Sequence, residues 1–266
     1  MPLFENLDEF KNVSPALQWA IFIVGALIAL VAVFALGVSI WLAIKYYKYN
    51  RVKNSANMTG KEAARTLLDK NGLKHVAVST WGSFIFGNSY SHYFNKVRLR
   101  RLTLNKNSLT SLAMASQKTG LAVLDKEGDA DMKARIRMTP FIYFGPFMFV
   151  PLVAGGILLD YFVFNMRGVA TTICLCISVL LYVISFVMSI KVLKTEVKAQ
   201  KKAFEMLKKE NMATDEELEQ INELFKLYNI EYVNDIIIAF LEMIMRVLSI
   251  IADVQNGSLS NKGSQD

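Results

Sequence analysis

The sequence predicts an α-helical, multi-span membrane protein with three or four transmembrane helices and a small α+β cytoplasmic subdomain. Hydrophobic residues make up 53% of the 266 residues, and the mean hydropathy is +0.30, which is high for a water-soluble protein. The formal net charge is nevertheless +7, because apolar and basic segments alternate along the chain. With only two His and two Cys, the sequence excludes a disulfide framework, a zinc finger and a metal site with three imidazoles.

The first transmembrane helix is predicted at residues 15–44, a stretch that contains no charged residue. Trp19 and Trp41 lie 22 positions apart, about 33 Å along a helix, and are expected to anchor it at the two membrane interfaces. The leader, residues 1–14, is acidic rather than basic. We therefore expect an uncleaved anchor and not a signal peptide.

Two further spans are predicted at residues 138–159 and 168–190. The linker between them is short enough to allow only a helical hairpin. The second span contains three prolines, which remove backbone donors and predict a kinked helix packed against neighbours: Pro140, Pro146 and Pro151. Cys174 and Cys176 in the third span are expected to be small packing residues.

A fourth apolar stretch, residues 232–251, is less uniform because charged residues recur along it. At 100° per residue they fall on one line of the helix: Asp235, Glu242, Arg246 and Asp253. Such a stripe cannot face lipid, so the helix either spans the membrane with its stripe toward other helices or lies at a surface or in a protein groove. The Gly/Ser/Asn-rich tail, residues 255–266, is predicted to be disordered.

The distribution of basic residues predicts the orientation. Residues 45–137 contain 18 Lys and Arg against 6 Asp and Glu, whereas the leader is acidic. The positive-inside rule therefore places the N-terminus outside, with residues 45–137 and the helical segment 191–229 in the cytoplasm. The tyrosines and lysines that follow the first span are expected to contact anionic lipid rather than nucleic acid.

Segment 45–137 is predicted to mix helices and strands. Thr59 and Glu62 have the spacing of a capping box that begins a helix. Runs of β-prone residues at 76–78, 83–86 and 97–99 predict a small sheet, and a further helix is expected from Ser108 to about residue 125.

One segment carries a family resemblance. Residues 58–76 read Met-Thr-Gly-Lys-Glu-Ala-Ala-Arg-Thr-Leu-Leu-Asp-Lys-Asn-Gly-Leu-Lys-His-Val. This segment resembles the region after the first span in bacterial membrane-bound neutral zinc metallopeptidases of the YugP type, and the resemblance extends through about residue 246. It implies a multi-pass protein of the bacterial plasma membrane with a metallopeptidase-like cytoplasmic subdomain.

Peptidases of that type need His-Glu-x-x-His on a helix, where two imidazoles bind zinc and the Glu activates water. The matching stretch here is Gln117-Lys118-Thr119-Gly120-Leu121, and no His-Glu dipeptide occurs in the sequence. The resemblance places Gln117 and Leu121 at the histidine positions, Lys118 at the glutamate position and Glu196 at the third ligand. We therefore expect no zinc, no other cofactor and no catalytic residue.

The sequence thus predicts a pseudopeptidase: a non-catalytic binding scaffold or subunit of a membrane protein complex. Its expected partners are the lipid bilayer and another membrane protein, and not nucleic acid. Two alternatives stay open. One is an active zinc metallopeptidase with an atypical site, and the other is a transport or channel component that uses the polar stripe of the fourth helix.

Overall fold

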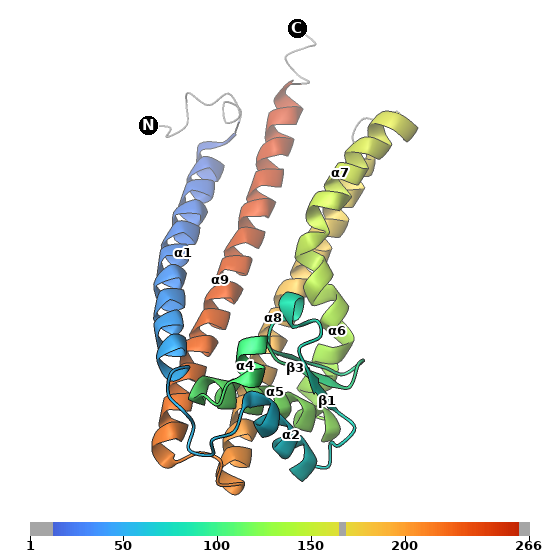
Figure 1. Cartoon of the computed structure of the whole chain (residues 1–266). Coiled ribbons are helices and arrows are strands. Elements are labelled where there is room, and N and C mark those ends of the chain that lie inside the picture. The colour runs from blue at the N-terminus through green and yellow to red at the C-terminus, as the bar shows by residue number, and fades with distance from the viewer. Residues whose placement is uncertain (1–12, 165–168, 261–266) are drawn as a thin grey trace. The chain divides into compact units, whose positions relative to one another are not determined.

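The computed structural model describes residues 13–164 and 169–260 (Figure 1). Helices dominate, and the chain divides into two compact units. We call Met1–Gly37, Gly145–Phe186 and Val233–Asp266 the first unit, and Val38–Phe144 with Val187–Tyr232 the second unit.

Four long or apolar helices contribute to the first unit: α1 (Pro15–Tyr49), α7 (Phe149–Leu159), α8 (Val169–Lys209) and α9 (Asp215–Ser260). A short π-helix, η2 (Asp160–Phe164), follows α7. Among the described residues, α1 and α8 are the two helices that are long and apolar enough to cross a membrane. They correspond to the predicted first and third spans. The other two spans stay predictions.

The predicted span 138–159 is divided between two helices, α6 (Ala130–Phe147) and α7. The division falls at Met148, three residues before Pro151. A proline nitrogen cannot donate to the carbonyl four residues earlier, which weakens the helix at that point.

Helix α8 begins against Asp160, whose carboxylate accepts hydrogen bonds from the backbone N–H groups of Ala170 and Thr171 at 2.9 and 2.8 Å. These bonds satisfy first-turn donors that a helix leaves unpaired. Helices α7 and α8 approach closely at Gly156, where an added Cβ would lie 2.8 Å from the Cα of Thr171.

The end of α9 differs from the prediction of a disordered tail, because the helix continues to Ser260. Ala252 packs against Val13 and Leu17, and Gln255 accepts a hydrogen bond from the backbone N–H of Ser14 at 3.1 Å. These contacts involve α9 at residues 252 and 255. Residues 261–266 of the predicted tail lie outside the described residues.

The second unit is built around α5 (Leu109–Lys126), which contacts α2 (Gly60–Lys70), α4 (Arg101–Asn105) and the sheet. The sheet has the order β1-β3-β2, from β1 (Ala77–Ser79), β2 (Ser89–Ser91) and β3 (Lys96–Arg98). Strand β1 pairs with β3 in parallel, and β2 pairs with β3 in antiparallel fashion. The predicted capping box is confirmed, since Thr59 and Glu62 exchange both bonds.

One predicted strand is wrong. Residues 83–86 form a short helix, α3 (Ser83–Phe86), and the central pairing partner is supplied by β3. Gly82 and Gly87 flank α3 with φ of 77° and 61°, a left-handed backbone that ends any extended run. Phe84, Ile85 and Phe86 are all exposed, so neither face of an extended segment would bury its large apolar side chains.

Candidate functional site

Helix α5 is buried along most of its length, from Leu109 to Leu124. Ser108 caps its first turn by accepting a hydrogen bond from the backbone N–H of Ser111. Farther along, a Cβ added to Gly120 would lie 2.4 Å from the carbonyl oxygen of Ala199. The absence of a side chain at Gly120 therefore lets α5 and α8 pack with their backbones in contact, and this brings Gln117 and Lys118 to face Glu196.

We call Gln117, Lys118, Arg135 and Glu196 the Glu196 centre. One carboxylate oxygen of Glu196, Oε2, accepts hydrogen bonds from Lys118 Nζ at 2.9 Å and Gln117 Nε2 at 3.0 Å. The other oxygen, Oε1, accepts from Arg135 Nη2 at 2.8 Å. Arg135 Nη1 also donates to Thr195 Oγ1 at 2.7 Å, so its guanidinium is held in place. Three helices, α5, α6 and α8, thus converge on one carboxylate.

The charges of the centre do not cancel. Glu196 is 2% exposed and Lys118 is 5% exposed, so both ions are taken out of water. Burial alone raises the pKa of the Glu196 carboxyl, but the charges of Lys118 and Arg135 and their hydrogen bonds outweigh it and lower that pKa well below its ordinary value. Glu196 is therefore ionised, and two cations face one anion.

The residues at this centre do not fit a zinc ion. Zinc takes thiolate, imidazole or carboxylate ligands, whereas the groups that meet Glu196 are an amide N–H, an ammonium and a guanidinium. These are donors, and the two cations repel a metal ion. Within residues 13–164 and 169–260, no three His, Cys, Asp or Glu side chains converge as a metal site. Of the two histidines, His92 contacts Asp125 at 2.6 Å, away from this centre.

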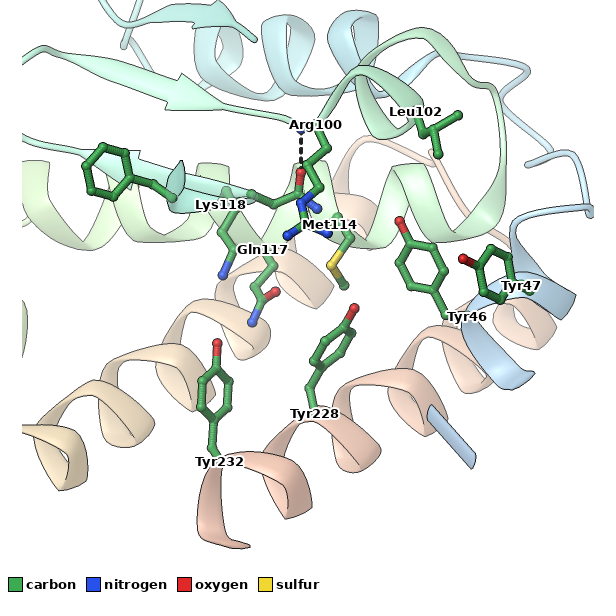
Figure 2. Close-up of a pocket in the computed structure, with 12 residues that line it drawn as sticks. Tyr46, Tyr47, Arg100, Leu102, Met114, Gln117, Lys118, Tyr228 and Tyr232 are labelled. Atoms are coloured by element: carbon green, nitrogen blue, oxygen red, sulfur yellow. Dashed lines mark hydrogen bonds between the residues drawn. The ribbon is translucent and has the colours of Figure 1, made fainter. Parts of the chain in front are cut away.

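A cavity of about 310 Å³ opens beside Gln117 and Lys118 (Figure 2). Tyr228 and Tyr232 of α9 point toward α5 across it, as Figure 2 shows. Arg100 lies at its rim, and the backbone N–H of Arg100 donates to Asn88 Oδ1 at 2.7 Å. The lining contains no Asp or Glu, and it is completed by these residues: Tyr46, Tyr47, Phe86, Gly87, Leu102 and Met114.

The tyrosine hydroxyls keep their donor capacity in this cavity. Burial, and then the nearby Tyr46 and Glu231, raise the pKa of Tyr228 well above its ordinary value, so its hydroxyl stays protonated. Together with Lys118 and Arg100, the cavity therefore offers positive charge and O–H and N–H donors to whatever enters it.

The other residues that the sequence singled out lie elsewhere. Trp19 and Trp41 are both exposed on α1, and their role as interfacial anchors stays a prediction. On α9, Glu242 accepts a hydrogen bond from Tyr182 Oη of α8 at 2.7 Å. The guanidinium of Arg246 lies 5.1 Å from the Tyr182 ring centroid.

The stripe has two further members, Asp235 and Asp253. Asp235 is exposed, and the side chain of Asp253 lies outside the described residues. Leu121 is buried and packs with Leu124, Met132 and Ala199, so it belongs to the apolar core and not to the Glu196 centre.

Arg135 and the two tyrosines of α9 carry no signal in the sequence that marks them as site residues. Arg135 comes just before a predicted span, where the positive-inside rule already explains a basic residue. The sequence therefore gives no reason to assign it to a site. Tyr228 and Tyr232 are four positions apart and share a helix face, but only the fold shows that this face meets α5.

Buried helix α5 thus presents an amide and an ammonium group to a glutamate of the later helix α8. The sequence model of the family described as "Putative neutral zinc metallopeptidase" matches residues 20–252, and the chain belongs to this family. The chain is also 25% identical over 221 residues to the "Putative membrane protease YugP" of Bacillus subtilis (strain 168), which covers 80% of this chain and 92% of that relative. No solved structure matches the chain.

Proposed function

We propose that this member of the zinc metallopeptidase family is a non-catalytic scaffold that binds a polypeptide of the membrane without cleaving it. The observation that carries the proposal is the ammonium of Lys118, 2.9 Å from the carboxylate of Glu196. A catalytic site would hold a metal cation against this carboxylate, and Lys118 and Arg135 already supply the positive charge there.

The cavity beside the centre gives the scaffold a place to bind. Its volume of about 310 Å³ is at the small end of ligand pockets. The two cations at its wall and rim, Lys118 and Arg100, favour an acidic side chain or a carboxylate over a basic one. Aromatic rings from α1 and α9 add apolar contact area. A short acidic or C-terminal segment of another membrane protein meets these requirements.

The decisive experiment is metal analysis of the purified full-length protein, combined with mass spectrometry of proteins that co-purify in mild detergent. We expect far less than one zinc per chain and a specific co-purifying membrane protein. A matched variant, Gln117→His/Lys118→Glu/Leu121→His, restores the two imidazoles and the glutamate on α5. Increased zinc in this variant alone would show that the three substituted positions determine the metal content.

Stoichiometric zinc in the natural protein, with peptide hydrolysis that Glu196→Gln abolishes, would overturn the scaffold and establish an active peptidase with an atypical site. A transport function predicts instead that neutralising Glu242 abolishes flux in reconstituted vesicles while the partner stays bound. The contacts of Glu242 and Arg246 with Tyr182 favour a role in helix packing for this stripe.

The same proposal includes the topology. We infer that the N-terminus lies outside and that Lys118 and Glu196 lie on the cytoplasmic side, because residues 45–137 are strongly basic. With Cys174 and Cys176 replaced by Ser, labelling of a single cysteine introduced at Asn12 or at Lys61 by a membrane-impermeant reagent in intact cells tests this. We expect labelling at Asn12 only.

A further inference from the structure

The second unit exposes an unusual group of large apolar side chains next to its sheet. We call Trp81, Phe84, Ile85, Tyr93 and Phe94 the aromatic patch. Their exposed fractions are 61, 97, 76, 64 and 58%. All five lie within residues 81–94, on α3 and the turns beside β2. Side chains of this size are rarely left in water as a group, and such groups mark interaction surfaces.

The patch is held in shape by a buried arginine. Arg98 is 6% exposed, and its guanidinium carbon lies 5.0 Å from the Phe86 ring centroid, 5.5 Å from that of Phe94 and 6.0 Å from that of Trp81. Lys96 Nζ lies 5.1 Å from the Trp81 ring centroid. Cation–π contacts with Arg98 and Lys96 therefore fix the positions of these rings. The rings are exposed although the segment makes defined contacts.

The segment of sequence that contains the patch carries charge of one sign. Between residues 70 and 124 the sequence contains eight Lys and Arg and not a single Asp or Glu. Asp125, the first acidic residue after this segment, is in contact with Tyr90 Oη and His92 Nδ1, both at 2.6 Å. A binding surface for the patch must therefore accept aromatic side chains and carry negative charge.

Contacts with helix α6 indicate where the patch lies relative to the expected membrane surface. A cavity of about 460 Å³ is bounded by Trp81, Tyr93 and Phe94 on one side and by Ile136 and Thr139 of α6 on the other. Tyr93 Oη also donates to the carbonyl of Ile136 at 3.3 Å. The predicted second span begins at residue 138, so the patch lies beside the point where α6 is expected to enter the bilayer.

We propose that the aromatic patch inserts into the headgroup region of the membrane, with the basic residues around it against anionic lipid. Trp, Tyr and Phe prefer this region because their rings are apolar and their polar edges can stay hydrated. Each Lys or Arg near an anionic surface adds attraction. A lipid surface fits better than a protein partner because both the aromatic composition and the single sign of charge match it.

The test uses the full-length protein in liposomes, with no other protein present. The variant Trp19→Phe/Trp41→Phe leaves Trp81 as the single tryptophan, since the sequence contains three. Its fluorescence is measured with lipids brominated near the headgroup end of the acyl chain, and with acrylamide in the water. We expect quenching by the brominated lipid, protection from acrylamide, and stronger quenching in anionic than in zwitterionic liposomes.

Phe84→Asp in the same background supplies the perturbation, because Phe84 is 97% exposed and its replacement does not disturb the core. We expect the ratio of inserted to withdrawn patch to fall about tenfold or more. Val52→Asp places the same charge at an exposed apolar position outside the patch. This control should leave the quenching of Trp81 unchanged.

Two results would overturn the proposal. One is a Trp81 that acrylamide quenches freely and brominated lipid does not, in both kinds of liposome. The other is protection of Trp81 in native membranes but not in liposomes, which would assign the patch to a protein partner.

Discussion

Glu196→Gln tests the electrostatic account of the Glu196 centre most directly. The change keeps the shape of the side chain but leaves the charges of Lys118 and Arg135 facing each other without an anion. Removing one member of a buried ion pair costs about 3–5 kcal/mol. For a protein of this size, each kcal/mol lowers the unfolding temperature by about 2–4 °C. We therefore expect the variant to unfold about 6–20 °C below the natural protein.

The measurement is thermal unfolding of the full-length protein in detergent, followed by circular dichroism. Glu205→Gln is the matched control, since Glu205 lies on the same helix and its side chain is 67% exposed. Its contact with Lys202 is a surface ion pair, worth about 0–1 kcal/mol. If Glu196→Gln unfolds within a degree or two of Glu205→Gln, the centre is not the compensated buried cluster described above.

The same pair of proteins gives a pH signature. Against the desolvation that opposes ionisation, Lys118 and Arg135 lower the pKa of Glu196 from 4.5 to about 2. Because the folded pKa is the lower one, its contribution to stability is complete above pH 4.5 and is lost as the pH falls toward 2. The difference between natural protein and Glu196→Gln should shrink over this interval.

Two further predictions concern packing. Gly120→Ala should lower the free energy of unfolding by about 1–3 kcal/mol, because the methyl group would meet a backbone carbonyl of α8. Gly37→Ala is the control in the same unfolding assay. It has open space around it and should be neutral or slightly stabilising. Tyr182→Phe removes the hydrogen bond to Glu242 and should lower the free energy of unfolding by about 0.6 kcal/mol, up to about 1.7 kcal/mol, in an SDS-unfolding titration. Tyr161→Phe, at an exposed position, should have no effect in the same titration.

Much of the fold follows from local sequence signals. The apolar run before Lys45 and the capping box at Thr59 are each determined by a few neighbouring residues, and the structure places helices accordingly. Residues 83–86 show where such signals fail. The run Ser-Phe-Ile-Phe has a high β propensity. The two glycines that flank it have positive φ and turn the chain, so the run forms a short helix instead of a strand.

The candidate site also combines residues that the sequence identifies with one that it does not. The resemblance places Gln117, Lys118 and Glu196 in one site, and the structure brings them within hydrogen-bond distance. Arg135 joins them from a third helix, and its contact with Glu196 spans 61 positions of sequence. No periodicity connects residues so far apart. The charge balance of the centre, which decides its chemistry, could therefore not be predicted from the sequence.

The burial of α5 affects the rate at which its amide hydrogens exchange with solvent. Its amide hydrogens are enclosed from Leu109 to Leu124, and such groups exchange with solvent only when the whole unit opens. Hydrogen exchange should therefore be slowest in α5 and fastest in exposed turns. Glu196 is buried against this helix, so its own backbone amide should also exchange slowly.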